Sequence, residues 1–350
     1  MEYRTLGRTG LDVSVLSMGG LFVSKAGGDD RLRAYDAIHR ALELGVNYVD
    51  TAPSYLDSEE VLGEGLERVG RTSTFAGDCG QSPYANERGR SPYAYIISTK
   101  LGGKPTPFNA RDLDQLKFSF RESLRLLQRD AVDILMVHEP DRPGQNDWWS
   151  DWESFTGPVT EYLAELKREG FITWTGLGGT TPYILAAICA TGQFDVVLTA
   201  FNYSLLWREA AIAVIPEAVK QNMGIVCGSP LQQGWLAKRF DEQVNDKPPA
   251  WLSPPRRKQF QALYALVDDL QMPITDLAIR WVISNPDVDT TLMGARSVAE
   301  VEMNVAAVEA GPLPADVMAR LEEIGAMVPF RPFNEPFGCG FYGYKGPGVG

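Results

Sequence analysis

The feature of this sequence that most constrains its fold is a regular alternation of two kinds of segment. Short apolar runs rich in β-branched residues end on Gly, Asp, Lys or His, and each is followed by a longer stretch with apolar residues at helical spacing. The eight runs are 13–18, 46–49, 95–99, 133–137, 172–177, 196–201, 225–228 and 290–293. Apolar strands that alternate with helices are typical of a parallel sheet covered by helices. Because there are eight such units, the pattern favours an α/β fold of the closed (β/α)8 TIM-barrel type.

The segments between the strands set the predicted domain organisation. Helices are predicted over 31–44, 58–69, 109–127, 158–168, 182–190, 209–221, 257–270, 274–284 and 298–307. A hairpin of residues 3–6 and 11–13, around the sequence GRTG, is expected to cap the floor of the barrel. We expect the barrel to span residues 1–328 and an aromatic, Gly/Pro-rich tail to span 329–350. An insert over 71–94, at the bottom face, is predicted to be a surface loop or a contact within a homo-oligomer.

Composition and charge argue against several classes of function. The 350-residue chain has 33 Lys and Arg against 45 Asp and Glu, and its net charge of −12 repels phosphate backbones, so nucleic-acid binding is not expected. An apolar signal segment and a run of 18 apolar residues are both lacking, which argues against a membrane protein. The four cysteines form no CxxC pair, which is typical of a reduced, cytoplasmic protein. Two histidines are too few for a histidine-rich metal centre.

Four polar side chains follow the ends of three neighbouring predicted strands. Asp50 ends the second strand, and Tyr55 lies in the loop just after it. Lys100 ends the third strand and His138 ends the fourth. Any one of them alone is explained as a solvated strand end. Because active sites of this fold lie at the carboxyl ends of the strands, the convergence of all four predicts a catalytic group.

The residue types predict what that group does. A free tyrosine titrates near ~10 and exchanges protons poorly at neutral pH. A neighbouring ammonium group favours the phenolate, so we expect Lys100 to lower the pKa of Tyr55. Asp50 is expected to hold and polarise Lys100. His138 is placed to donate a hydrogen bond to a substrate oxygen, so the set is interpreted as a proton relay facing a carbonyl or an alcohol.

These residues lie within motifs that resemble those of the aldo-keto reductase superfamily. The segments NYVDTAPSY, SEEVLGEGLE, IISTK, SLRLLQRDAVDILMVH and MGARSVAEVEMN occur in the family's order over roughly residues 1–310. The resemblance implies a barrel that binds NAD(P) without a Rossmann domain and transfers hydride between nicotinamide and a carbonyl/alcohol pair. It further implies that Tyr55 is the general acid/base, that Lys100 and Asp50 tune it, and that His138 orients the carbonyl.

The resemblance also implies where the cofactor binds. Gly19 and Gly20, after the first strand, would let the nicotinamide approach the backbone closely. The segments GSPLQQGWL (228–236) and GARSVAEVEMN (294–304) resemble the loops that contact the pyrophosphate and the adenylate end. The further expected contacts are Asp50, Gly178, Gly179, Ser229, Leu231, Gly234, Gly294, Arg296, Glu300 and Asn304. A glutamate at position 300 repels a 2′-phosphate and accepts a bond from a ribose hydroxyl, so it favours NAD over NADP, although Arg296 acts in the opposite direction.

Three positions in the expected nicotinamide seat depart from the family pattern. Gly178–Gly179 stand where many relatives have Ser-Asn, Leu198 replaces a common glutamine, and Gly228 replaces the aromatic residue that stacks on nicotinamide. Thr180 and Asn202 are candidates to supply the hydrogen bonds that are lost.

The expected substrate contacts are Phe22, Trp148 and Trp149. The two tryptophans belong to a top-face loop after the fourth strand and could stack on a sugar ring or an apolar ligand. The segments VHEPDRP and DVVLTAFNYSLL partly resemble the aldose 1-dehydrogenase-like branch, whose members oxidise sugars to lactones. A small aldehyde, ketone or sugar hemiacetal is therefore the expected substrate. The alternative is a nicotinamide-binding, redox-sensing subunit with little turnover, like the potassium-channel β-subunits that share the fold.

Overall fold

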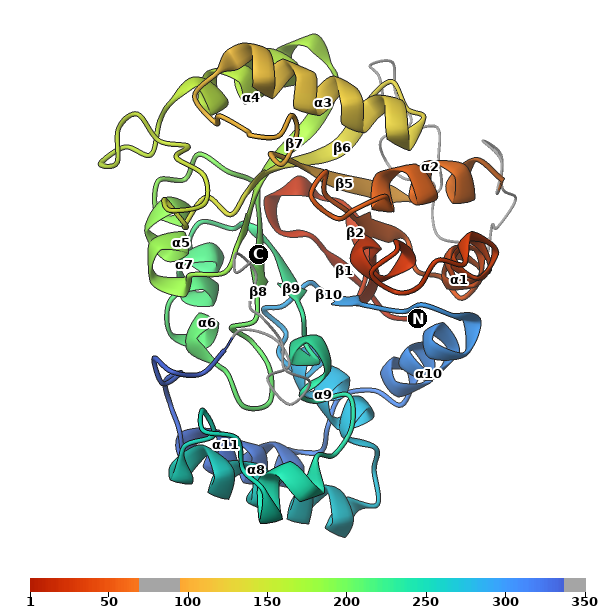
Figure 1. Cartoon of the computed structure of the whole chain (residues 1–350), viewed down its shortest axis with the longest axis vertical. Helices are drawn as coiled ribbons and strands as arrows, with labels where there is room; N and C mark the ends of the chain where they lie inside the picture. The colour runs from red at the N-terminus through yellow and green to blue at the C-terminus, as the bar shows by residue number, and fades with distance from the viewer. Residues whose placement is uncertain (69–94, 337–350) are drawn as a thin grey trace.

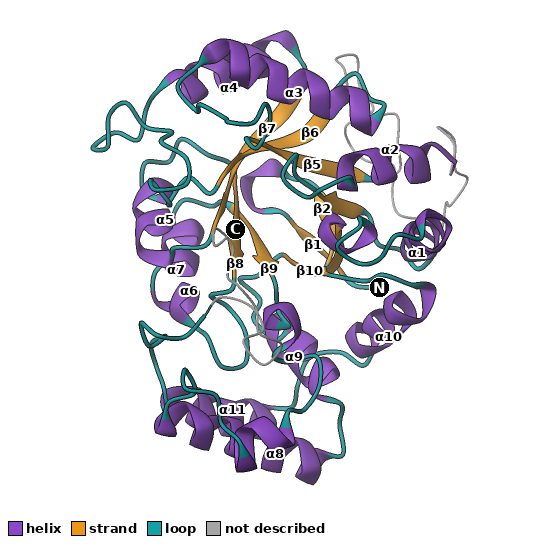
Figure 2. Cartoon of the chain, viewed as in Figure 1, coloured by secondary structure: helices purple, strands orange, loops and turns teal. Residues whose placement is uncertain are grey.

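Eight parallel strands close into a barrel at the centre of the molecule (Figures 1 and 2). This arrangement comes from a computed structural model that describes residues 1–68 and 95–336. The insert over 71–94 and the end of the predicted tail lie outside the described residues. Around the barrel the strands follow the order β10-β3-β4-β5-β6-β7-β8-β9. They are β3 Leu16–Gly19, β4 Tyr48–Asp50, β5 Ile96–Leu101, β6 Val132–His138, β7 Ile172–Gly179, β8 Val196–Ala200, β9 Gly224–Gly228 and β10 Thr290–Met293. The predicted (β/α)8 fold is confirmed.

Helices surround the barrel on its outer side (Figure 2). They are α1 Arg31–Glu43, α2 Ser58–Arg68, α3 Leu113–Leu127, α4 Pro158–Glu169, α5 Pro182–Cys189, α6 Glu209–Ile212, α7 Val214–Lys220, α9 Ile274–Ile283 and α10 Val298–Glu309. Two more helices, α8 Pro254–Leu270 and α11 Ala315–Ala326, pack on each other at the lower end of the view in Figure 1. The sequence pattern did not predict α11.

Local chemistry explains where the helices differ from prediction. The helix predicted from residue 109 begins at Leu113, because the Asp112 side chain accepts hydrogen bonds from the amides of Asp114 and Gln115 and caps it. The single helix predicted over 209–221 is two helices. Proline at position 216 has no N–H to donate to the carbonyl four residues earlier, at Ile212, which is where α6 ends.

The N-terminal hairpin closes the floor of the barrel, as predicted. Its strands β1 Tyr3–Thr5 and β2 Asp12–Ser14 are antiparallel. The first predicted barrel strand is therefore divided, and its second half alone enters the barrel as β3. Gly7, with φ +45°, lies so close to the start of β9 that a Cβ atom would sit 2.3 Å from the Gly224 nitrogen. Only glycine fits there.

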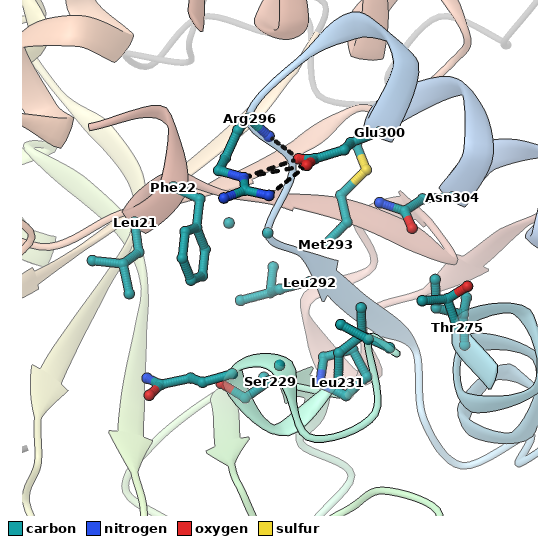
Figure 3. A pocket seen from close by; sticks show the side chains of 18 of the residues that line it. Leu21, Phe22, Ser229, Leu231, Thr275, Leu292, Met293, Arg296, Glu300 and Asn304 are labelled. Atoms are coloured by element: carbon teal, nitrogen blue, oxygen red, sulfur yellow. Dashed lines mark hydrogen bonds and ion pairs between the residues drawn. The ribbon is translucent and has the colours of Figure 1, made fainter. Parts of the chain in front are cut away.

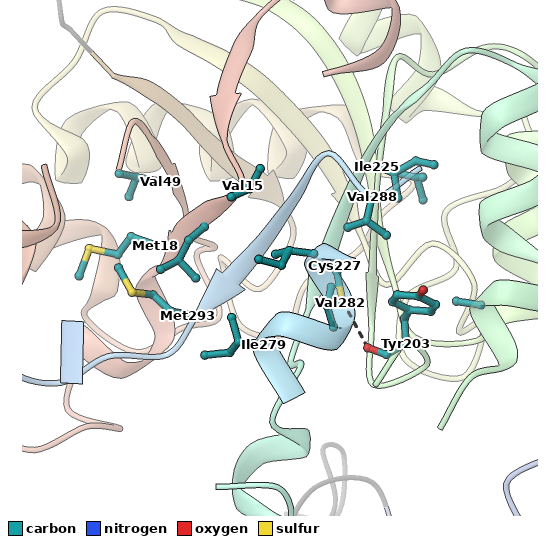
Figure 4. Packing of buried hydrophobic residues seen from close by; sticks show 14 of the residues in the cluster. Val15, Met18, Val49, Tyr203, Ile225, Cys227, Ile279, Val282, Val288 and Met293 are labelled. Carbon is teal, nitrogen blue, oxygen red and sulfur yellow. Dashed lines mark hydrogen bonds between the residues drawn. The ribbon is translucent and has the colours of Figure 1, made fainter. Parts of the chain in front are cut away.

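Two apolar clusters form the core. One fills the barrel interior and consists of Leu6, Val13, Tyr48, Ile134, Met136, Val196, Leu198, Val226 and Leu292. The larger one joins the outer face of the barrel to the helices, and Figure 4 shows part of it between β9, β10 and α9, including Ile225, Cys227 and Ile279. Burying a side chain of this kind stabilises the fold by roughly 1.5–3 kcal/mol. The cores hold the strands rigidly, so their carboxyl ends present side chains in fixed positions.

The first residues of the predicted tail pack against the barrel's helices. Glu335 forms an ion pair with Arg256 of α8 at 2.7 Å, and both side chains are fully buried. The indole N–H of Trp207 donates to the same carboxylate at 2.9 Å. The tail thus leaves the described part of the chain beside the loop that follows β8.

Candidate active site

Strand pairing brings Asp50 and Lys100 together. The β4–β5 register places Asp50 opposite Ser98. Since side chains alternate along a strand, Lys100 points to the same face as Ser98. The Lys100 ammonium donates to Asp50 Oδ1 at 2.8 Å, to Oδ2 at 2.7 Å and to the Thr51 carbonyl at 2.7 Å. Both side chains are buried, and all three ammonium protons are used.

Tyr55 lies in the turn between β4 and α2, next to this ion pair. The Lys100 nitrogen is 5.0 Å from the centroid of the Tyr55 ring. Burial, together with the negative charges of Asp50 and Glu139, raises the pKa of the Tyr55 phenol well above its usual value. This direction is opposite to the expected one, because burial of the phenol dominates and the two carboxylates add to its effect. The phenol is therefore protonated at neutral pH.

His138 ends β6 and faces Tyr55. The two rings meet edge to face, with 5.7 Å between centroids and 81° between planes. Burial, and next the positive charge of Lys100, lowers the pKa of His138 to about 3, so the imidazole is neutral. Its Nδ1 lies 3.3 Å from the Ser54 hydroxyl. The site can therefore present two uncharged hydrogen-bond donors, a phenol and an imidazole, over a buried cation.

Two acids directly after His138 escaped the sequence reasoning. Burial raises the pKa of Glu139 to about 7 and that of Asp141 to about 6. Glu139 accepts a hydrogen bond from the Thr180 hydroxyl at 2.6 Å, and Asp141 accepts from the Thr180 amide at 2.8 Å. The two acids are visible in the sequence HEPD at 138–141, but the sequence does not indicate that both carboxylates pack against the end of β7.

A cavity of about 590 Å³ lies beside the four-residue group, within the size range of roughly 300–1,000 Å³ that is usual for ligand sites. Asp50 and Tyr55 line one part of it. Figure 3 shows Leu21 and Phe22 at the left of the cavity, Ser229 and Leu231 below it, Arg296 and Glu300 above it and Asn304 at the right. The expected cofactor residues that line this cavity are Gly19, Asp50, Ser229, Leu231, Gly234, Gly294, Arg296, Glu300 and Asn304.

Three glycines expected to contact the cofactor do not line the cavity. A Cβ atom at Gly20 would lie 2.5 Å from the Ser58 hydroxyl. One at Gly178 would lie 3.1 Å from Cε of Lys100, and one at Gly179 would lie 2.7 Å from the Asp141 carboxylate. These glycines leave room for protein side chains, and their contact with the cofactor stays a prediction.

The altered nicotinamide seat is apolar. Leu198, Ala200 and Gly228 line the cavity where the family pattern places a glutamine and an aromatic ring. The candidate substitutes are engaged elsewhere: the Thr180 hydroxyl bonds Glu139, and the Asn202 amide donates to the Thr180 and Ala200 carbonyls at 2.7 and 2.9 Å.

The structure places the three expected substrate contacts in two different environments. Trp148 and Trp149 have no exposed surface, and their indole N–H groups each donate at 2.9 Å to the carbonyls of His138 and Pro140. Neither ring offers a free face, so both anchor the loop behind the site. Phe22 packs over Gly294, where a Cβ atom would come within 2.6 Å of its ring, and it therefore lies among the expected cofactor residues.

Arg296 and Glu300 form an ion pair at the rim of the cavity. The guanidinium donates to Glu300 Oε1 at 2.8 Å, and the Arg296 amide donates to Oε2 at 2.7 Å. The hydrogen bond to Glu300 raises the pKa of Arg296. Burial opposes ionisation of Glu300, but its bonds to Arg296 outweigh that effect and lower its pKa. Both groups are charged, and each neutralises the other.

Within residues 1–68 and 95–336, no group of three or more His, Cys, Asp or Glu side chains is arranged to hold a metal ion. In the same part of the chain, none of the helices is both long and apolar enough to cross a bilayer.

The barrel, the buried Lys100–Asp50 pair and the adjoining cavity form the arrangement that the resemblance in the sequence implies. The chain belongs to the aldo/keto reductase family, whose model matches residues 16–326. NAD(P)-dependent oxidoreduction is the general activity of that family. The resemblance inferred from the sequence is thereby confirmed.

Individual relatives place the chain within this family. It is 29% identical over 320 residues to L-galactose dehydrogenase of Arabidopsis thaliana, covering 88% of both chains. It is 25% identical over 359 residues to a probable voltage-gated potassium channel subunit beta of the same plant, covering 95% of this chain and 99% of the relative. The solved holo form of aldo-keto reductase AKR11C1 from Bacillus halodurans superposes with a TM-score of 0.71 at 24% identity, covering 96% of this chain and 100% of that one, which shows the shared fold.

Proposed function

We propose that this protein transfers hydride between a nicotinamide dinucleotide and a small carbonyl/alcohol pair, with Tyr55 as the general acid/base. The observation that carries the proposal is the meeting of Asp50, Tyr55, Lys100 and His138 at the carboxyl ends of β4, β5 and β6, beside the cavity. The location of these residues alone would be weak support. The protonation states give stronger support. The Tyr55 phenol and the His138 imidazole are both neutral, so both can donate hydrogen bonds to an oxygen on which negative charge develops.

In the reduction direction, the Tyr55 hydroxyl donates its proton to the carbonyl oxygen. Its raised pKa keeps that proton in place until charge develops on the substrate. With Nδ1 of His138 accepting from the Ser54 hydroxyl, Nε2 carries the ring proton and hydrogen-bonds the same oxygen. Lys100, held by Asp50, supplies a fixed positive charge next to the phenol ring. In the oxidation direction each step runs in reverse.

The residues that line the cavity fit the cofactor. Gly228 has no side chain, and a Cβ atom there would lie only 3.1 Å from Leu198 and 3.2 Å from Ala200, so glycine leaves this part of the cavity wall uncrowded. Ser229 and Asn304 offer polar groups, Arg296 offers a cation, and Ser297 caps the N-terminus of α10 beside the rim. When bound, the nicotinamide supplies or accepts the hydride.

We further propose that NAD is preferred to NADP. Glu300 already holds the Arg296 guanidinium at 2.8 Å, so a 2′-phosphate would have to displace a carboxylate and then lie beside it. A ribose hydroxyl meets no such repulsion and can donate to Glu300.

The substrate class proposed is an aldehyde, a ketone or a sugar hemiacetal. The similarity to L-galactose dehydrogenase supports including sugars. The similarity to a potassium channel subunit beta does not by itself favour a sensor without turnover.

The test is an absorbance assay of nicotinamide reduction state with NAD and NADP against a panel of sugars, aldehydes and ketones. The wild type is compared with Tyr55→Phe, and Tyr162→Phe serves as a matched control because that tyrosine is buried on α4, outside the site. We expect turnover with at least one substrate, loss of at least a hundredfold in Tyr55→Phe, and wild-type rates in the control. Cofactor binding without any turnover would overturn the enzymatic proposal in favour of the sensor.

A further inference from the structure

Tyr48 places a phenol inside the apolar interior of the barrel. It is fully buried and packs with Leu6, Val13 and the inward side chains of the strands. A buried hydroxyl without a partner is costly, so its hydrogen bond determines how the ring lies. The Tyr48 hydroxyl donates to Ser98 Oγ at 2.9 Å.

This bond continues into the group described above. Ser98 Oγ donates to Asp50 Oδ1 at 2.7 Å. A serine hydroxyl has one proton, and because Tyr48 acts as the donor on the other side, that proton is free to point at Asp50. Strand periodicity makes the chain continuous: Tyr48 and Asp50 share one face of β4, Ser98 and Lys100 share one face of β5, and the two strands pair with Asp50 opposite Ser98.

We propose that Tyr48 and Ser98 are positioning residues for the reaction, which hold Asp50, and through it Lys100, in the orientation that serves Tyr55. Asp50 accepts from Ser98 on Oδ1 and from Lys100 on both oxygens, so the carboxylate has no freedom to rotate. The Lys100 ammonium in turn has its three donors fixed. The Tyr48–Ser98 pair thereby extends the site down into the barrel core, where neither residue can contact substrate.

The alternative is that Tyr48 and Ser98 merely satisfy each other. The direction of the bonds argues against this alternative, because the Ser98 hydroxyl donates its only proton to the Asp50 carboxylate and not to a main-chain carbonyl. Bonds to a charged group are stronger than bonds between neutral groups, so the loss of Ser98 is felt mainly at Asp50.

The experiment compares Tyr48→Phe, Ser98→Ala and the double variant with the wild type. Tyr203→Phe is the matched control, since the hydroxyl of that buried tyrosine accepts a hydrogen bond from the Asn285 side-chain amide, away from the four-residue group. The inference rests on the proposed function, so each variant is measured for kcat and KM with a substrate that the wild type turns over, for the Kd of the nicotinamide dinucleotide and for thermal stability. A crystal structure of Ser98→Ala is determined as well.

We expect kcat to fall about tenfold in Ser98→Ala and less in Tyr48→Phe, with KM and Kd changing by no more than about twofold. The double variant should be no slower than Ser98→Ala, because the two residues act in series. Unchanged kcat in both folded single variants would overturn the proposal, as would parallel losses of kcat, cofactor affinity and thermal stability. If the wild type turns over none of the panel, the proposed function fails and the crystal structure decides: a Lys100 nitrogen displaced from Asp50 supports positioning, and an unmoved one refutes it.

Discussion

Gly178 and Lys100 are packed against each other across the ends of β7 and β5. A methyl group on Gly178 would lie 3.1 Å from Cε and 3.4 Å from Cδ of the lysine. The lysine stem cannot move aside freely, because its ammonium is fixed by three hydrogen bonds. A glycine at the strand end is therefore a condition for the position of the buried cation.

This contact predicts that Gly178→Ala lowers kcat several-fold. The added methyl pushes the lysine stem and tilts its ammonium away from the Tyr55 ring. Steady-state kinetics test the effect, and Gly144→Ala is the matched control because a Cβ atom at Gly144 meets no atom within 4 Å. Wild-type kcat in Gly178→Ala would contradict the prediction.

Removing one member of the Asp50–Lys100 pair should cost both activity and stability. Lys100→Met leaves a buried carboxylate without its counter-ion, which typically destabilises a fold by about 3–5 kcal/mol. The double variant Asp50→Asn/Lys100→Met should recover most of that stability but none of the activity. Urea unfolding measures the first quantity and turnover the second. Equal stability of the single and double variants would show that the unpaired charge is not the cause.

Glu300 should control the choice between NAD and NADP. In Glu300→Gln the Arg296 guanidinium is no longer neutralised and can pair with a 2′-phosphate. We expect the ratio of the NADP and NAD dissociation constants to shift toward NADP by about tenfold or more. Fluorescence titration measures both constants. Glu302→Gln is the control, because Glu302 pairs with Arg40 outside the cavity.

Glu139 should make stability depend on pH. Its pKa of about 7 in the folded protein lies above its ordinary value of 4.5, so the folded state binds more protons than the unfolded state between these values. The contribution of Glu139 to the free energy of unfolding is therefore complete below about pH 4.5 and is lost as the pH rises through about 7. Its upper limit is about 3 kcal/mol.

The measurement is urea unfolding of the wild type and of Glu139→Gln between pH 5 and pH 8. The amide cannot ionise, so we expect a flatter profile in the variant. Asp141 contributes in the same direction, since its pKa is raised to about 6. It accounts for the pH dependence of the free energy of unfolding that remains in the variant. A wild-type slope in Glu139→Gln would rule out Glu139 as the titrating group.

The order of the strands and the identity of the four-residue group were predictable from the sequence. Apolar periodicity marks each strand, and a strand's last residue faces the top of a barrel whatever its neighbours are. Asp50, Lys100 and His138 could therefore be assigned to one rim before any contact was known. The division of residues 209–221 was missed because a single proline sets that boundary locally, and the start of α3 because the Asp112 side chain caps it. The helix α11 was not predicted.

What the sequence by itself determined was which side chains reach the active end of the barrel. The tertiary structure alone decided what surrounds them, since burial and pair geometry depend on residues far apart in the chain. It reversed the expected pKa shift of Tyr55, because the phenol is buried and lies near the carboxylates of Asp50 and Glu139. The tertiary structure also buries Trp148 and packs Gly178 against the side chain of Lys100. Protonation follows from the local dielectric and the nearest charges, and neither can be read from a residue's position along the chain.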